Sequence, residues 1–325
     1  MVLFREMRSD AMFCSVLFAM YVAEVLLLAN NALTGVIPTS LERATGLQIL
    51  SLNKNSLFGS LPTLAGMSNL VTLMLGDTYL GGSIPDAWGN LNLLETLSLK
   101  NTTNFLGELP SSFRNLTNLK HLDLTNSKFE GTLPEFLGDM SSLEFLSGSD
   151  IANRCGNALL SSCDTSSVSF SGSIPTTVGL LTKLSKCRFH FDLRGNAPWN
   201  EALLAHEPRA RTVHFEFLHS GLSGPIPSEL AKCSRLETIV LGSSSITGSL
   251  PSELGSLSSL RNLDVRETSI TGSVPAEFAM LLNLEVLDVR GTPMTGSLPS
   301  GICDSGSSTM VFAEPGALSG CSCCE

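Results

Sequence analysis

The 325-residue sequence has little charge, and it lacks the basic excess of a nucleic-acid-binding protein. Charged residues make up 15% of the chain, and 20 Lys and Arg against 30 Asp and Glu give a formal net charge of -10. Binding to a phosphate backbone requires a stripe of positive charge. The composition therefore argues against nucleic acid as a partner. The hydrophobic fraction of 43% predicts a folded chain and not a disordered one.

The sequence also lacks the short motifs of the common enzyme classes. It contains no Gly-x-Ser-x-Gly elbow, no phosphate-binding loop and no His-Glu-x-x-His zinc motif. Its single Ser, His and Asp residues do not form a recognisable catalytic set. We therefore predict a protein that is not an enzyme and that uses neither a cofactor nor a metal ion.

What the sequence does have is a fixed period. A Gly-x-hydrophobic-Pro tetrapeptide recurs ten times, mostly at spacings of 23 to 25 residues. A period in this range is typical of leucine-rich repeats. Two larger gaps, of 41 and 52 residues, indicate an insertion and a repeat that has lost its Gly and Pro, so we expect about eleven repeats. The tetrapeptide glycines are Gly35, Gly59, Gly82, Gly107, Gly131, Gly172, Gly224, Gly248, Gly272 and Gly296.

Each period also carries aliphatic residues at set offsets. In the last regular repeat, Leu287 and Val289 alternate with Asp288 and Arg290, which is the pattern of a short β-strand. No repeat can bury its leucines alone, so its neighbours must cover them. These features predict an α/β repeat fold, a leucine-rich-repeat solenoid that curves as a right-handed superhelix with a parallel β-sheet on its concave face.

A polar position follows each predicted strand. It is Asn31 and Asn55 in the first repeats, where the amide is expected to bond the backbone of the turn that leaves the strand. Later repeats carry a hydroxyl, which can serve the same turn as donor and acceptor. We interpret the series as a structural ladder without a catalytic role. Its hydroxyl members are Thr78, Thr102, Ser127, Ser220, Ser244, Thr268 and Thr292.

Repeats such as LQILSLNKNSLFGSLP and LRNLDVRETSITGSVP resemble the 24-residue repeats of plant-type extracellular leucine-rich-repeat proteins. The resemblance covers roughly residues 26–300, and the Gly-x-Ile/Leu-Pro element is its distinguishing mark. The family includes receptor-kinase ectodomains, receptor-like proteins and inhibitors of cell-wall-degrading enzymes. The chain departs from it in having no kinase motifs after the repeats and no paired-cysteine cap before them. Its Cys-Ser-Cys-Cys tail and its hydroxyl ladder look closer to secreted algal members.

The pattern predicts three segments. Residues 1–25 form an apolar N-terminal segment, residues 26–300 the solenoid, and residues 301–325 a cysteine-rich C-terminal cap. Within the solenoid we expect an irregular insertion around residues 147–170 and irregular repeats over residues 180–222.

The N-terminal segment has two competing interpretations. Residues 11–29 are nearly all apolar and follow Arg5 and Arg8, which resembles a secretory signal or a membrane anchor. The alternative is a degenerate first repeat, since cleavage after this segment would cut that repeat in half. A third possibility is a chain that lacks an upstream cap. The first repeat already uses Leu26, Leu28, Asn31 and Leu33.

The chain has nine cysteines. Terminal repeats need a cap, and a disulfide knot is the usual device in secreted proteins. A zinc site is disfavoured because the C-terminal spacing is too compressed. Cys187 and Cys233 occupy repeat positions and are expected to be buried thiols. The disulfide candidates are Cys155 and Cys163 in the insertion, and Cys303, Cys321, Cys323 and Cys324 in the cap.

Two N-glycosylation sequons occur, at Asn101 and Asn115. They matter if the chain enters the secretory pathway. Together with the family resemblance, they favour a secreted or cell-surface protein, with membrane association possible through the N-terminal segment.

Ligand-binding residues are expected on the concave face, where outward side chains form a regular array. Two adjacent arginines, Arg266 and Arg290, could grip a carboxylate or sulfate; the alternative is a solvated ladder in which Asp264 and Asp288 neutralise them. Histidines in the irregular repeats could bind a metal or sense pH, but we favour an island that shapes a binding surface. The candidates are Lys100, His121, Asp123, Arg188, His190, His214, Glu216, Asp264, Arg266, Asp288 and Arg290.

The sequence thus predicts a non-catalytic recognition module that binds a protein, peptide or polysaccharide. One alternative is a secreted inhibitor of a cell-wall-degrading hydrolase. Another is an intracellular leucine-rich-repeat scaffold, which would keep its C-terminal thiols reduced and carry no glycan on Asn101.

Overall fold

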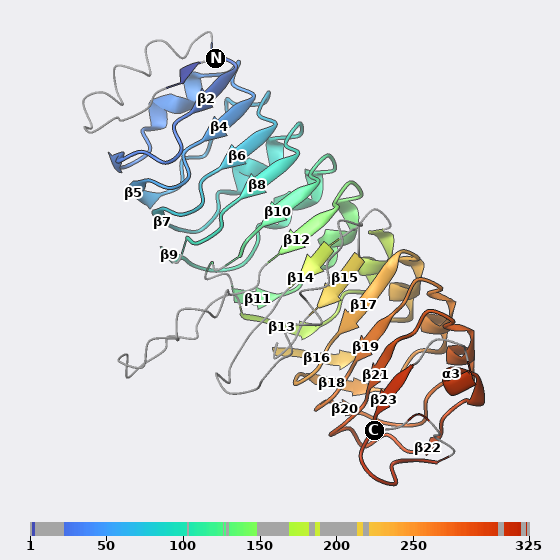
Figure 1. The fold of residues 1–325 in the computed structure, drawn as a ribbon. Helices are drawn as coiled ribbons and strands as arrows, with labels where there is room; N and C mark the ends of the chain where they lie inside the picture. The colour runs from blue at the N-terminus through green and yellow to red at the C-terminus, as the bar shows by residue number, and fades with distance from the viewer. Residues whose placement is uncertain are drawn as a thin grey trace, which may run out of the picture. The chain divides into compact units, whose positions relative to one another are not determined.

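A computed structural model describes most of the repeat region. The described residues are 2–3, 23–102, 104–125, 127, 130–147, 169–181, 186–188, 213–216, 221–304, 309–319 and 323. The chain divides into two units (Figure 1). Unit 1 comprises Met1–Ser149 and Ser166–Ser171, and unit 2 comprises Asp150–Thr165 and Gly172–Glu325.

Unit 1 is built on a parallel main sheet with one short strand per coil. Neighbouring strands pair in register at intervals of one repeat, so that Leu50 lies between Leu26 and Leu73. The strands in spatial order are β1 (Val2–Leu3), β2 (Val25–Leu27), β4 (Ile49–Ser51), β6 (Thr72–Met74), β8 (Thr96–Ser98), β10 (His121–Asp123) and β12 (Phe145–Ser147).

A second set of strands and a series of 3₁₀ helices complete the coils of unit 1. The side strands β3 (Thr34–Gly35), β5 (Ser56–Ser60), β7 (Tyr79–Gly82) and β9 (Asn104–Phe105) form a parallel sheet. Strand β11 (Glu130–Thr132) pairs with the first three residues of β13 (Ser169–Ser173). The 3₁₀ helices are η2 (Thr39–Arg43), η3 (Asp86–Asn90), η4 (Ser111–Asn115) and η5 (Glu135–Asp139).

Unit 2 repeats the same plan. Its main strands are β14 (Lys186–Arg188), β15 (Val213–Glu216), β17 (Leu236–Val240), β19 (Asn262–Asp264), β21 (Val286–Asp288) and β23 (Met310–Phe312). Its side strands are β16 (Gly221–Pro225), β18 (Ser245–Gly248) and β20 (Ser269–Ile270), with β22 (Gly296–Ser297) pairing with β24 (Leu318–Ser319). Its helices are η6 (Thr176–Leu180), η7 (Ser228–Lys232), η8 (Ser252–Ser256), η9 (Ala276–Met280) and α3 (Ser300–Asp304). Both units therefore have the predicted leucine-rich-repeat solenoid fold, with parallel strands in stacked coils.

The Gly-x-hydrophobic-Pro element turns the chain from the side strand into the 3₁₀ helix. All ten of its glycines have φ between 75° and 111°, a region that other residues rarely adopt. The proline then precedes the helix, and its carbonyl accepts a hydrogen bond from the third helical residue, as in Phe278 N to Pro275 O at 3.1 Å. That third residue is buried in every described 3₁₀ helix, which explains the fixed spacing of the element.

The core of the coils is mostly aliphatic, with buried aromatic side chains such as Trp88 and Phe278, and it is continuous from one coil to its neighbours. In the last regular coil, Leu284, Leu287, Val289, Met294 and Leu298 are all buried. Burying one such side chain stabilises the folded state by roughly 1.5–3 kcal/mol. The contacts that remove it from water come largely from the adjacent coils.

The first coil begins within the apolar N-terminal segment. Leu26, Leu28 and Leu33 are buried, and Asn31 Nδ2 donates to Leu28 O at 2.9 Å. Residues 23–29 thus contribute to the solenoid. Residues 4–22 lie outside the described part of the chain. Among the residues that the structure describes, no helix has the length and apolar character to cross a bilayer.

The predicted hydroxyl ladder is confirmed in the described coils. Thr78, Thr268 and Thr292 each donate to the carbonyl three residues earlier, at 2.7, 2.7 and 2.6 Å. Asn55 does more, because its amide donates both to Leu52 O in its own coil and to Leu28 O in the coil before, each at 2.8 Å. These three hydroxyls close the turn within one coil, whereas the asparagine also links two coils.

Thr268→Val should destabilise unit 2 by about 1–3 kcal/mol. The substitution keeps the shape of a buried side chain but removes the donor to the Val265 carbonyl. Chemical denaturation would measure the change. The exposed Thr247→Val on β18 is the matched control, and it should stay within about 0.5 kcal/mol of wild type. Equal effects of the two changes would contradict a structural role for the ladder.

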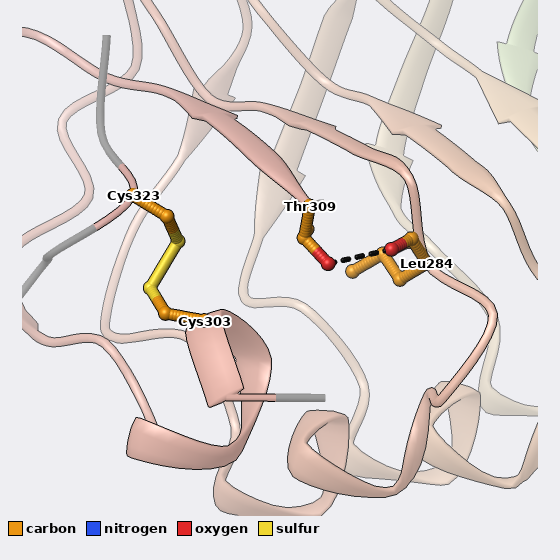
Figure 2. The surroundings of a disulfide bond; sticks show 4 residues. All are labelled: Leu284, Cys303, Thr309 and Cys323. Carbon is orange, nitrogen blue, oxygen red and sulfur yellow. Dashed lines mark hydrogen bonds between the residues drawn. A yellow bond between two sulfur atoms is a disulfide. The ribbon is translucent and has the colours of Figure 1, made fainter. Parts of the chain in front are cut away.

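The C-terminal segment closes unit 2 with a strand and a disulfide. Strand β23 pairs in parallel with β21, so the main sheet continues into the segment that the sequence assigns to a cap. A disulfide joins Cys303 in α3 to Cys323, and Thr309 donates to Leu284 O at 2.6 Å (Figure 2). Val311 N also donates to Cys323 O at 3.1 Å, so the bridge lies next to the last strand. The candidates Cys155, Cys163, Cys321 and Cys324 lie outside the described residues.

Cys303→Ser should loosen the end of unit 2. The disulfide closes a sequence separation of 20 residues, which corresponds to about 3 kcal/mol in a chain-entropy model. We expect faster amide hydrogen exchange at Val311, and the same change in wild type after reduction. If neither treatment alters exchange at β23, the bridge does not stabilise the final coil.

Candidate functional site

The predicted ligand-binding residues of unit 1 lie on or beside the main sheet. His121 and Asp123 are the outward-facing first and last residues of β10, and Lys100 follows β8. The exposed His121 ring stacks against Phe145 with centroids 6.0 Å apart. Asp123 Oδ1 accepts a hydrogen bond from Thr125 N at 3.0 Å, which fixes the turn after the strand. These side chains share one face but do not form a cluster of opposite charges.

The irregular repeats place two of their candidates opposite each other. In the parallel pairing of β14 with β15, Arg188 aligns with Glu216 and Lys186 with His214. Phe215 is buried, as expected for a phenylalanine that takes the place of a strand leucine. His190 lies outside the described residues, so the predicted histidine island stays a prediction.

The other four candidates come together in unit 2, on the outward face of the main sheet. Strands β19 and β21 align Asp264 directly with Asp288, and each acid is followed two residues later by an arginine. Figure 1 shows the strands β19, β21 and β23 side by side. We call this cluster the charge quartet; its members are Asp264, Arg266, Asp288 and Arg290.

Asp288 is the better bonded of the two acids. Its Oδ1 accepts from Arg290 Nε at 2.9 Å and from Arg290 N at 3.2 Å, and its Oδ2 accepts a short hydrogen bond from Arg290 Nη2. Arg266 Nη1 lies 3.9 Å from the same Oδ2. The Arg290 guanidinium also lies 4.9 Å from the centroid of the Phe312 ring, within the range of a cation–π contact. Arg290 is therefore held in one orientation by two contacts.

Asp264 has fewer bonds. Its Oδ1 accepts from Arg266 N at 3.0 Å, and its Oδ2 lies 3.6 Å from Arg266 Nε, which is an ion pair without hydrogen-bond geometry. Gly242 lies beside Asp264 on the preceding coil, where a Cβ would approach the Asp264 carboxylate to 3.1 Å. The absence of a side chain at Gly242 thus makes room for the Asp264–Arg266 pair.

Each arginine is paired with the aspartate of its own coil, as the neutralised-ladder alternative expects, but the acids are buried and not solvated. Asp264 and Asp288 are only 5% and 4% exposed, whereas the Arg290 side chain is 46% exposed. A buried carboxylate destabilises the folded state unless it is paired. The two buried acids therefore stay paired with the arginines and orient them. The arrangement presents one oriented guanidinium to solvent above a buried network whose formal charges sum to zero.

Burial also changes the titration of Asp264. It raises the pKa of the carboxyl from 3.8 to about 6, because the charged form loses water, and the Arg266 guanidinium only partly opposes this. Between about pH 4 and about pH 6 the folded chain therefore holds a proton that the unfolded chain has released. Through this window the Asp264 contribution to the free energy of unfolding falls as pH rises.

Asp264→Asn should remove this contribution. The amide can still accept the hydrogen bond from Arg266 N, but it does not titrate. The free energy of unfolding of the variant, minus that of wild type, should rise by roughly 1–3 kcal/mol from pH 4 to pH 6. Urea denaturation at several pH values measures this difference. Asp139→Asn, which alters an exposed acid beside Arg114, is the control. A difference that does not vary with pH would disprove the assignment.

An apolar border beside the quartet was not predicted from the sequence. Phe312 aligns with Asp288, and the exposed Met310 aligns with Val286, so β23 supplies an apolar edge beside the arginines. A signal was present, since Val311 follows Leu287 by one period of 24 residues and Leu318 follows Met294 by the same interval. The loss of the Gly-x-hydrophobic-Pro element hid this last coil.

The two sequons differ in their surroundings. Asn115 is exposed at the end of η4, away from the main sheet. Asn101 is half-buried beside the main sheet, and its Nδ2 donates to Asp77 Oδ1 at 2.5 Å. Of the two, Asn115 has the geometry that a glycan would need in the folded chain.

Protein-family models match two parts of the chain. A leucine-rich repeat region model matches residues 27–162, and a leucine-rich repeat model matches residues 283–305. The charge quartet spans residues of β19 and β21 and the turns after them, so only its second half falls within a match.

Curated relatives include plant receptor-like proteins. Receptor-like kinase TMK2 of Arabidopsis thaliana is 30% identical over 122 residues, and Receptor-like protein 39 of the same plant is 36% identical over 113 residues. The alignments cover 37% and 34% of this chain. They span only 14% and 13% of those relatives.

Solved structures extend the likeness to nearly the whole chain. The crystal structure of a TDR receptor is 26% identical with a TM-score of 0.70, covering 94% of this chain and 45% of that one. The repeat pattern, the stacked coils and these similarities together show a leucine-rich-repeat protein that is similar to plant receptor-like proteins and receptor ectodomains.

Proposed function

We propose that this chain is a non-catalytic recognition module that binds a peptide through the outward face of its main sheet. The charge quartet with its apolar border would be the main contact. The relatives and the structural neighbour are receptors, which supports recognition as the class of function. The disulfide between Cys303 and Cys323 supports a secreted or cell-surface location, since such bonds persist in oxidising compartments.

The observation that carries the proposal is the fixed guanidinium of Arg290. Its contacts with Asp288 and Phe312 lower the entropy that would be lost when it binds an anion. A guanidinium can donate to both oxygens of a carboxylate or of a sulfate, which a point charge cannot match. Arg266 lies two residues after the end of β19 and adds a second positive group near Asp288.

The border suggests what accompanies the anion. Val286, Met310 and Phe312 line the same face beside the arginines. A peptide that ends in an apolar residue would present its carboxylate to the quartet and its last side chain to this border. We therefore propose a peptide C-terminus as the ligand group, in preference to a neutral glycan.

A peptide library with free C-termini tests the proposal on the immobilised full-length chain. Selected peptides should lose at least about tenfold in affinity when the C-terminus is amidated, since a charged hydrogen-bonded pair contributes about 1.5–3 kcal/mol. Arg266→Ala combined with Arg290→Ala should cause a similar loss. Biolayer interferometry would provide both values.

The control is Arg114→Ala combined with Arg235→Ala, which removes equal charge from exposed sites off the main sheet. This variant should bind as wild type does. Peptides that bind the quartet variant unchanged would place recognition elsewhere. Tight, stoichiometric inhibition of a secreted hydrolase, unaffected by the quartet variant, would favour the inhibitor alternative.

A further inference from the structure

We propose that proton uptake by Asp264 switches the net charge of the quartet and strengthens its grip on an anion as the solution becomes mildly acidic. This inference rests on the proposed function, because it concerns regulation of the same site. It concerns Asp264 and not Asp288, and the two acids differ in ways that the structure shows directly.

The two buried acids accept unequal numbers of hydrogen bonds. Asp288 accepts hydrogen bonds from both Nε and Nη2 of Arg290 and from its backbone. Asp264 accepts one backbone hydrogen bond, and the nearest guanidinium nitrogen of its own arginine is 3.6 Å away. A buried carboxylate with fewer donors takes up a proton more readily. Consistent with this, the pKa of Asp264 is raised to about 6.

The charges that face Asp264 come from two coils. Its own coil contributes Arg266, and the following coil contributes Asp288 and Arg290. On the other side, Val240 of β17 aligns with Asp264 and Gly242 follows two residues later, and neither carries charge.

Other charged groups lie near the quartet. Glu314 is a negative group close enough to affect Arg290, and Arg261, which immediately precedes β19, is paired with Glu237 and Glu285. The quartet itself holds two acids and two arginines. Its net charge is therefore zero when Asp264 is ionised and +1 when it is protonated.

Protonation of Asp264 changes how the quartet acts on a bound anion. Above about pH 6, an anion near Arg266 and Arg290 is repelled by both carboxylates. Below it, one repulsion is gone, and the protonated Asp264 oxygen becomes a hydrogen-bond donor. Removing a unit charge several ångströms away at an effective dielectric of about 20 is enough for roughly a three- to tenfold gain in affinity at a half-exposed site.

Thermodynamic linkage requires that the coupling between protonation and anion binding is reciprocal. If protonation strengthens anion binding, anion binding must favour protonation. The bound anion should therefore raise the pKa of Asp264 further and draw a proton from solution at pH values just above 6. This proton uptake is a signature that a merely structural Asp264 would not give.

Inorganic sulfate is a suitable probe for the full chain. The side-chain Nε–H NMR signals of Arg266 and Arg290 would be followed during sulfate titrations at pH 5 and pH 7, with ionic strength held constant by chloride. We expect the apparent Kd to be about three- to tenfold lower at pH 5. Asp264→Asn should give the same Kd at both pH values, because its side chain stays neutral.

Asp139→Asn is the matched control and should keep the pH dependence of wild type. Pronounced pH dependence that survives in Asp264→Asn would overturn the inference. Equal sulfate affinity at both pH values in wild type would also overturn it, but would leave anion recognition standing. No response of either arginine at any pH would remove the proposed quartet site itself.

Discussion

The structure depends on one constraint, which is that a coil cannot bury its own leucines. Each strand is only a few residues long, and its inward side chains are removed from water by the strands before and after it. Backbone pairing follows the same rule, since the hydrogen bonds of a strand run to neighbouring coils. Stability is therefore shared along the stack and does not depend on one central core.

This division of labour leaves the outward face of the main sheet free to vary. Inward positions must be apolar, and the turn positions must supply Gly, Pro and a hydroxyl or amide. The outward positions carry no such demand, so any non-uniform set of residues there needs another explanation. The charge quartet is such a set, because it buries two carboxylates on this face. Its burial destabilises the coil locally unless the pairing is retained, and that pairing orients Arg290.

Much of this could be predicted from the sequence. The period, the strand alternation and the hydroxyl ladder each follow from local rules, and the structure confirms them in Leu287, Val289 and Thr268. The adjacency of Asp264 with Asp288 also follows from the period, because a fixed repeat sets the register of a parallel sheet. The close packing of this cluster did not follow, since it depends on the lack of a side chain at Gly242 beside Asp264 and on the ring of Phe312 beside Arg290. Phe312 itself lies in a coil whose turn element has been lost.

The same reasoning explains why the two acids, identical in repeat position, behave differently. Asp288 has a contributing coil on each side: Arg266, which follows β19, lies near its carboxylate, and Phe312 of β23 contacts its partner Arg290. Asp264 has a charged coil on one side only, because the preceding coil offers Val240 and Gly242. A repeat protein thus gives equivalent residues unequal chemistry through their neighbours in the stack. Asp264 lies in the first coil of the charged pattern, and its carboxyl is therefore less well paired than that of Asp288. A site that we propose to respond to pH thus arises from ordinary residues through their position in the stack.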